Sequence, residues 1–142
     1  MKIVRQILDR KGWDVWSIDA GAPVYDAIRM MAEKEIGALV VTDGGRLAGI
    51  ISERDYARKV ILKGKSSRET ATREIMTRRV VTVGPDRTVQ DCMALMTGRR
   101  IRHLPVTEGD RVVGMLSIRD LLRATIADQQ FTIEQLERYI TG

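Results

Sequence analysis

The chain contains the same stretch of sequence twice. Shifted by 65 positions, residues 15–58 align with residues 80–123 without a gap, and 15 of the 44 aligned pairs are identical. Chance would give about three identities, because any one residue type makes up roughly 5–10% of a chain. The match is clearest in the two endings, GIISERDYAR (49–58) and GMLSIRDLLR (114–123). An internal duplication therefore determines the fold, which must consist of two copies of one unit.

Each copy predicts the order strand, helix, strand, turn, strand, helix. In the first copy the strands are expected at 15–18, 38–42 and 46–52, and the helices at 23–35 and 53–64. In the second copy the strands are expected at 80–83, 103–107 and 111–117, and the helices at 88–99 and 118–127. One such unit buries too little apolar surface to be stable alone. We therefore expect an α+β fold in which the two copies pack together.

Three segments lie outside the repeat. Helices are expected at 1–11 and at 132–140, where apolar residues recur at helical spacing. The polar segment 63–73 reads as a linker, and a further helix over 66–76 is expected to begin at a Ser67 or Thr70 cap. The predicted division is 1–64 for the N-terminal helix and first repeat, 65–127 for the linker helix and second repeat, and 128–142 for a C-terminal helix.

Composition and charge limit the partners. The chain has no apolar run near the ~20 residues of a membrane helix and no apolar signal core near its start, so no membrane partner is expected. The lone Cys92 agrees with a reducing compartment, and we expect a cytoplasmic protein. The net charge of +5 favours anionic partners in general. Aromatic residues make up only 4%, which argues against a stacking platform for nucleic acid.

The residues for common catalytic chemistries are missing from the sequence. There is one cysteine and one histidine, no Cys/His spacing typical of a metal site, and no glycine-rich phosphate loop. Cys92 aligns with Ala27 on a helix face and is interpreted as a small core residue. We therefore expect no catalytic residues, no metal and no catalytic cofactor.

The motif Ser-x-x-Asp occurs at the start of the last helix of each copy. The spacing is close to that of a capping box, in which each side chain binds the other residue's backbone N–H. A helix N-terminus is also a ready phosphate site, and a carboxylate can accept hydrogen bonds from ribose hydroxyls. Serine, arginine and aspartate together suit a nucleotide, and capping can hold at the same time. The candidate phosphate and ribose residues are Ser52, Arg54, Asp55, Ser117, Arg119 and Asp120.

The repeated segments IGALVVTDGGRLAGIISERD and IRHLPVTEGDRVVGMLSIRD resemble CBS domains, the regulatory modules named after cystathionine β-synthase. The resemblance covers about residues 1–127. It implies two β-α-β-β-α repeats packed about a pseudo-twofold axis, as in a stand-alone Bateman-type module, and a homodimer. It also implies that an adenosine-containing ligand such as AMP, ATP or NAD binds in clefts between the repeats.

The resemblance extends the set of candidate binding residues. In the family, the position of Gly37 and Arg102 often carries basic residues that meet phosphates, which points to Arg102 and His103 in the second copy. In the family, adenine lies near the first strand of a repeat and the start of the second strand. The weaker candidates for adenine binding are Ser17, Ile18, Ala38, Thr82 and Val83.

The sequence thus predicts a ligand-sensing regulatory module that signals to a separate, unidentified protein partner. The alternative is a non-catalytic dimeric scaffold whose ligand clefts are vestigial. Affinity for an adenine nucleotide distinguishes the two. A nucleic-acid binder that uses the arginines is a third reading, and a steep salt dependence of oligonucleotide binding would support it.

Overall fold

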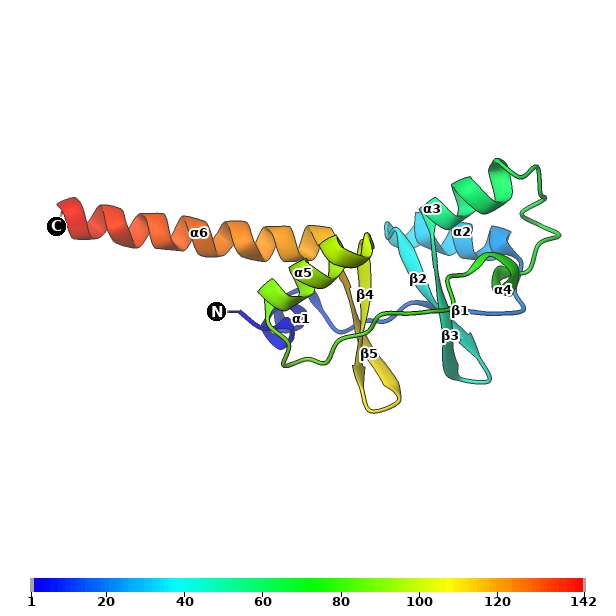
Figure 1. Cartoon of the computed structure of the whole chain (residues 1–142), viewed down its shortest axis with the longest axis horizontal. Helices are drawn as coiled ribbons and strands as arrows, with labels where there is room; N and C mark the ends of the chain where they lie inside the picture. Colours follow the sequence, from blue (N-terminus) through cyan, green and yellow to red (C-terminus); the bar gives the residue numbers. More distant parts are fainter. Residues whose placement is uncertain (1, 142) are drawn as a thin grey trace. The chain divides into compact units, whose positions relative to one another are not determined.

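The first repeat folds into a three-stranded sheet in the computed structural model, which describes residues 2–141. The strands β1 (Ser17–Asp19), β2 (Ala38–Asp43) and β3 (Arg46–Ser52) lie in that order in the sheet. β1 runs parallel to β2, and β2 runs antiparallel to β3. Helix α2 (Val24–Lys34) makes the crossover from β1 to β2 (Figure 1). Its buried residues Val24, Ala27 and Met31 recur at helical spacing, and the helix predicted at 23–35 is confirmed.

The second repeat reproduces much of this arrangement 65 positions later. Helix α5 (Val89–Arg99) is followed by β4 (His103–Glu108) and β5 (Arg111–Ser117), which form a two-stranded sheet. The strand predicted at 80–83 is reduced to one parallel bridge between Val83 and Val106. That bridge has the register of the pair between Ile18 and Val41 in the first repeat. The first strand of the second repeat is therefore present only at its central residue.

The ends of α2 and α5 show the duplication in the backbone. Glu35 and Arg100, which are equivalent positions, both adopt a left-handed conformation with φ of 55°. Each donates its backbone N–H to a carbonyl of the last turn, as a residue that ends a helix commonly does. Neither residue is glycine, yet both helices end within one residue of the predicted ends at 35 and 99.

The last helix of each repeat differs from its predicted length. In the first repeat, α3 (Glu53–Tyr56) continues as a π-helical turn, η1 (Ala57–Ile61), and Gly64 follows with a φ of 66°. In the second repeat, α6 (Ile118–Thr141) is one helix of 24 residues. The prediction of two helices, at 118–127 and 132–140, was wrong. The intervening residues 128–131 contain neither glycine nor proline, so nothing breaks the helix there.

The linker helix is shorter than predicted. Helix α4 (Thr72–Ile75) begins after Ala71, so Ser67 and Thr70 are not its caps. Their backbones are used differently, because the carbonyls of Ser67 and Thr70 accept hydrogen bonds from the amides of Tyr25 and Val24. Glu74 instead reaches back to the amide of Ala71, at 2.7 Å. Pairing of the linker with the start of α2 thus decides where α4 begins.

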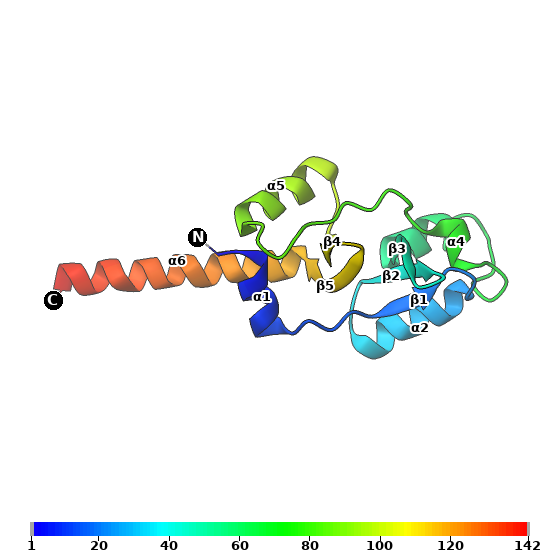
Figure 2. The same ribbon diagram turned by 90° about the horizontal axis from the view of Figure 1, so that it is seen from below.

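The chain divides into two compact units. The first-repeat unit contains Asp14–Val81 and Glu108–Val113, and the second-repeat unit contains Met1–Trp13, Thr82–Thr107 and Gly114–Gly142. The N-terminal helix α1 (Val4–Lys11) therefore belongs with the second repeat, where it crosses beside α6 (Figure 2). Val4 and Leu8 of α1 are fully buried. The domain boundaries at 64/65 and 127/128 remain predictions.

Candidate ligand-binding site

The Ser-x-x-Asp motif of the first repeat is a capping box. Ser52 ends β3, and its side-chain oxygen accepts a hydrogen bond from the Asp55 amide at 3.1 Å. The Ser52 amide donates in return to Asp55 Oδ2 at 3.0 Å. Two of the free N–H groups at the start of α3 are thereby satisfied, and the predicted capping role is confirmed.

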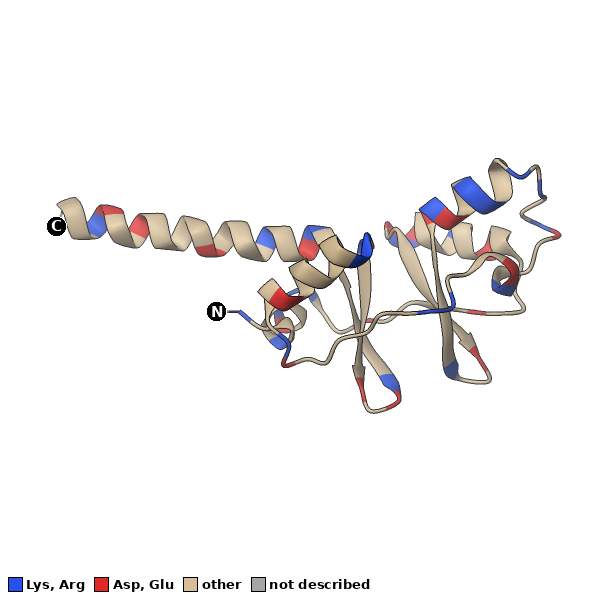
Figure 3. Cartoon of the chain, in the orientation of Figure 1, with Lys and Arg blue, Asp and Glu red and all other residues tan. Residues whose placement is uncertain are grey.

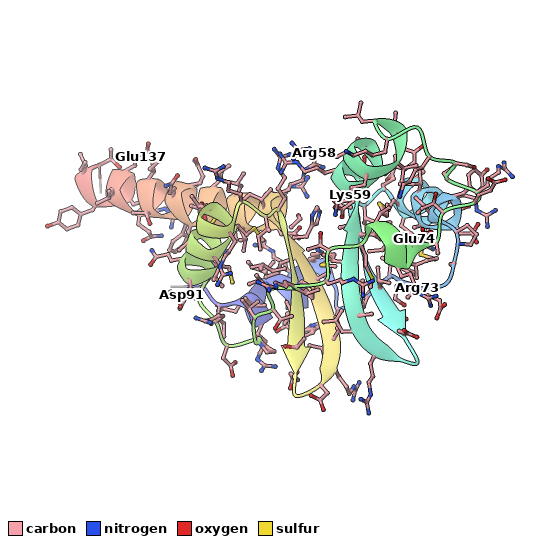
Figure 4. All side chains as sticks on the ribbon, turned by 45° about the vertical axis from the view of Figure 1, so that its right-hand side comes forward. Arg58, Lys59, Arg73, Glu74, Asp91 and Glu137 are labelled. Atoms are coloured by element: carbon pink, nitrogen blue, oxygen red, sulfur yellow. The ribbon has the colours of Figure 1, made fainter. Side chains whose placement is uncertain are left out.

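Both carboxylate oxygens of Asp55 have further partners. The Ser52 hydroxyl donates to Oδ2 at 3.1 Å, and Lys59 Nζ lies 3.0 Å from Oδ1. The Thr77 hydroxyl makes a longer contact with Oδ1, at 3.5 Å. Lys59, labelled in Figure 4, also donates to the carbonyl of Ile75. The carboxylate of the first repeat is therefore fully engaged by its own unit.

The motif of the second repeat has the same cap but a different cation. The Ser117 amide donates to Asp120 Oδ2 at 2.8 Å, and the Asp120 amide donates to Ser117 Oγ at 3.2 Å. Lys11 Nζ, from α1, lies 2.6 Å from the same Oδ2 and 2.7 Å from the carbonyl oxygen of Met115. These contacts converge on Oδ2. Among the described residues of this unit, none donates to Asp120 Oδ1 or accepts from the Ser117 hydroxyl.

Arg102 and His103 lie beside this motif. The Ile118 amide donates to the Arg102 carbonyl at 2.8 Å, which joins the start of β4 to the start of α6. The Glu53 amide makes the equivalent bond to Gly37 in the first repeat. The side chain of Arg102 is exposed, whereas His103 is half-buried. The unit thus brings a cation, an imidazole, a hydroxyl and a carboxylate to one edge of the sheet.

The surroundings of His103 favour its neutral form. Burial lowers the pKa of His103, and the nearby positive charges of Lys11 and Arg102 lower it further, while Asp120 acts in the opposite direction. A neutral imidazole donates one hydrogen bond and accepts another, so His103 contributes directional hydrogen bonding instead of charge. Arg102 and Lys11 are the positive groups of this cluster.

Of the weaker candidates for adenine binding, Ser17, Ile18 and Ala38 lie on strands, Val83 forms an isolated bridge, and Thr82 precedes that bridge outside any strand. Ser17 and Ile18 pair with Val40 and Val41 in the sheet, and Ala38 pairs with Ser52. Val83 uses both backbone groups, because its amide donates to Pro105 and its carbonyl accepts from Thr107. A role for Val83 in adenine recognition would therefore rest on its side chain.

The candidate residues divide between the two units. The first-repeat unit holds Ser17, Ile18, Ala38, Ser52, Arg54 and Asp55. The second-repeat unit holds Thr82, Val83, Arg102, His103, Ser117, Arg119 and Asp120. Arg54 and Arg119 are the second residues of α3 and α6, and both side chains are exposed.

Two lysines next to the carboxylates were missed from the sequence. Lys59 follows Asp55 by four residues, a spacing at which opposite charges pair on a helix, so this contact was available as a signal. Lys11 lies 109 positions from Asp120, and no local pattern connects them.

Over residues 2–141, no cluster of three or more His, Cys, Asp or Glu side chains is arranged to hold a metal ion. Cys92 is fully buried on α5, and burial raises the pKa of its thiol to about 11. Of the helices within residues 2–141, none combines the length and the apolar character needed to cross a membrane.

Known proteins resemble this chain over most of its length. Arabidopsis thaliana CBSX3, named a mitochondrial CBS domain-containing protein, is 44% identical over 124 residues, which are 84% of this chain and 60% of that protein. The match to CBSCBSPB2 of the same plant covers only 22% of that protein, so the chain spans a part of these relatives.

Solved structures share the fold. A protein with CBS domains from Burkholderia ambifaria is 51% identical, with a TM-score of 0.87 over 93% of this chain and 99% of that one. The CBS domain pair of MJ0100, solved with 5′-methylthioadenosine and S-adenosyl-L-methionine, is 26% identical, with a TM-score of 0.80 over 90% of this chain and 98% of that one. The profile of the CBS domain matches residues 4–62 and again 72–127. The chain therefore belongs to the CBS domain family, as a tandem pair.

Proposed function

We propose that this chain is a non-catalytic regulatory module whose second repeat binds an adenosine-containing ligand. The observation that carries the proposal is that the two motifs differ in which of their polar groups are already hydrogen-bonded. Within its own unit, Asp120 keeps one carboxylate oxygen without a donor and Ser117 keeps a free hydroxyl hydrogen, whereas Ser52 and Asp55 use theirs on each other and on Lys59.

The free groups match the parts of a nucleotide. A carboxylate oxygen accepts hydrogen bonds from vicinal ribose hydroxyls, and a hydroxyl beside a helix N-terminus donates to a phosphate. Arg102 adds an exposed guanidinium, which can form two parallel bonds to phosphate. Lys11, already beside Asp120, adds a second positive charge. The MJ0100 pair, solved with two adenosine compounds, supports the choice of ligand class.

The ligand would act by favouring one conformation of the pair or of its homodimer, and so bias an unidentified protein partner. AMP, ATP and NAD are the candidates within the class. We propose the cytoplasm as the compartment because the lone Cys92 needs no oxidising environment. The mitochondrial designation of the Arabidopsis relative makes a fluorescent fusion the appropriate check.

The first prediction tests the proposal by ligand-induced stabilisation. The melting temperature of the full chain should rise with one or more of AMP, ADP, ATP, NAD, NADH and S-adenosylmethionine, but not with GTP. A ligand at 100 times its dissociation constant adds about 2.7 kcal/mol to the free energy of unfolding. Arg102→Ala should weaken a phosphate-bearing ligand by about tenfold or more, since a charge-assisted hydrogen bond contributes about 1.5–3 kcal/mol.

Arg111→Ala is the matched control, because Arg111 is an exposed arginine at the start of β5 and away from the motif. It should leave ligand affinity unchanged. A flat response to the whole panel would contradict ligand binding and favour the scaffold function with vestigial clefts. Equal losses in Arg102→Ala and Arg111→Ala would contradict the assignment of Arg102.

A further inference from the structure

Helix α6 carries a long apolar stripe that is exposed to solvent. Its large apolar members are between 45% and 79% exposed: Leu122, Ile126, Ile133, Leu136 and Ile140. Every residue from 126 to 141 is exposed, so the distal half of α6 has no buried contact within residues 2–141 (Figure 1). Figure 3 shows acidic and basic residues on that half, and none of them is a member of the stripe.

The spacing of the stripe is that of a coiled-coil seam. Its members, with Gln129 included, follow one another at intervals of four and three residues: 122, 126, 129, 133, 136 and 140. In heptad terms, isoleucine occupies each a position and leucine two of the three d positions, with Gln129 at the third. In parallel coiled coils, isoleucine at a and leucine at d favour two strands, so this pattern bears on the number of helices and not on their orientation.

The stripe also needs a partner for physical reasons. A helix draws most of its stability from packing an apolar face, and isolated helices of about 15 residues are marginal in water. Helices α5 and α1 pack against the first part of α6, where Lys2 also pairs with Asp128. Beyond that pair, α6 continues for 13 residues as an amphipathic helix in which every residue is exposed.

We propose that the stripe pairs with α6 of a second copy of this chain, as an antiparallel two-stranded coiled coil. In this arrangement Leu122 lies opposite the partner's Ile140, Ile126 opposite the partner's Leu136, and Gln129 opposite the partner's Ile133. The seam is therefore complementary to itself under a twofold axis, as a homodimer requires.

Charge complementarity selects the antiparallel orientation. Antiparallel helices bring their e positions together, which places Arg123 beside the partner's Glu137, twice per dimer. Arg123 and Glu137 are exposed, and neither forms an ion pair with a described residue of its own unit. Glu137 lies on the distal half of α6 (Figure 4). A parallel pair would place Thr132 beside the partner's Glu137 and would form no such pair.

The second prediction is tested by sedimentation equilibrium of the full chain. The wild type should be dimeric, and Ile133→Asp combined with Leu136→Asp should raise the dissociation constant at least about 100-fold, because two charges replace the centre of the seam. Both residues are about half exposed, so the unit should still fold, with an unchanged melting temperature of the dissociated chain. Phe131→Asp is the matched control, since Phe131 is equally exposed but lies on the outer face of the helix.

Orientation is tested by exchanging the charges. Arg123→Glu and Glu137→Arg should each weaken the dimer about fivefold, and the chain carrying both changes should recover wild-type affinity. A wild type that stays monomeric at about 100 μM, or a dimer indifferent to the two aspartates, overturns the proposal. A dimer that the exchange does not restore overturns the antiparallel register. Ligand-induced stabilisation is measured separately, so its failure would not be mistaken for loss of the coiled coil.

Discussion

Asp55 and Asp120 occupy the same position of the repeat, yet the groups around them differ. Asp55 is held by a lysine four residues away on its own helix. Asp120 is held by Lys11, from the opposite end of the chain. The cap itself is identical in both repeats because it depends only on residues three apart. The two aspartates thus have the same capping role but are paired with lysines from different parts of the chain.

His103 should make stability depend on pH. Because folding lowers the pKa of His103 from about 6.5, the unfolded chain binds a proton more readily than the folded chain. The contribution of His103 to the free energy of unfolding is therefore fully present above about pH 6.5 and is lost as the pH falls towards the lower, folded value. Urea unfolding at about pH 8 and about pH 5.5 should show a smaller pH-dependent loss in His103→Gln than in the wild type. Parallel losses in the two proteins would contradict the pKa shift.

In each repeat, one glycine allows a strand to pack closely against a neighbouring segment of the same unit. A Cβ on Gly49 in β3 would lie 2.7 Å from the Thr77 carbonyl oxygen and 2.7 Å from Met76 Sδ. Thr77 cannot retreat easily, because its backbone pairs with Ile50 through two hydrogen bonds. A Cβ on Gly114 in β5 would instead meet the end of the Leu8 side chain, also at 2.7 Å. The backbone of the segment that follows α4 thus packs directly on β3, while a side chain packs on β5.

Glycine-to-alanine variants at three sites should separate these effects. Gly49→Ala should lower the free energy of unfolding by about 1–3 kcal/mol, and Gly114→Ala by less, since a leucine side chain can shift more cheaply than a paired backbone. Gly98→Ala, in α5, should raise it by about 0.5–1 kcal/mol, because that site is helical and open. Chemical denaturation of the three variants checks the order. A Gly49→Ala protein as stable as the wild type would show that the segment containing Met76 and Thr77 moves away from β3.

At the scale of the whole molecule, the N-terminal helix is attached to the last one. Lys11 binds both Asp120 and the Met115 carbonyl, so one side chain joins α1 to β5 and to the start of α6. Val4 and Leu8, on the same face of α1 as Lys11, are fully buried. The second-repeat unit is therefore built from both ends of the chain.

The Lys11–Asp120 pair should be measurable as a coupling energy. A double-mutant cycle of Lys11→Met and Asp120→Asn should give about 1 kcal/mol or less at low salt, and less at high salt, because Lys11 is partly exposed. The corresponding cycle of Lys59→Met and Asp55→Asn provides the local comparison. Strict additivity of Lys11→Met and Asp120→Asn in urea unfolding would show that the contact contributes no net stability.

Much of the local structure followed from the sequence. The duplication predicted the order of elements, and the helical spacing of Val24, Ala27, Ile28 and Met31 predicted helix α2, in which all of these except the partly buried Ile28 are buried. The Ser-x-x-Asp spacing predicted both caps. The unbroken α6 was also predictable, since residues 118–141 contain no glycine or proline, but the length of the repeat suggested a stop at 127.

Tertiary structure alone decided the remainder. Residues within about four positions of each other interact whatever the chain does elsewhere, so caps and helix faces can be read from a sequence. The pairing of Lys11 with Asp120 and the grouping of α1 with the second repeat depend on contacts about a hundred residues apart. The same long-range contacts determine that one oxygen of Asp120 stays free. Lys11 contacts Oδ2 of Asp120 from α1, whereas Lys59 contacts Asp55 from the same helical segment. The sequence by itself thus determined two equal motifs, and the packing of distant helices made them unequal.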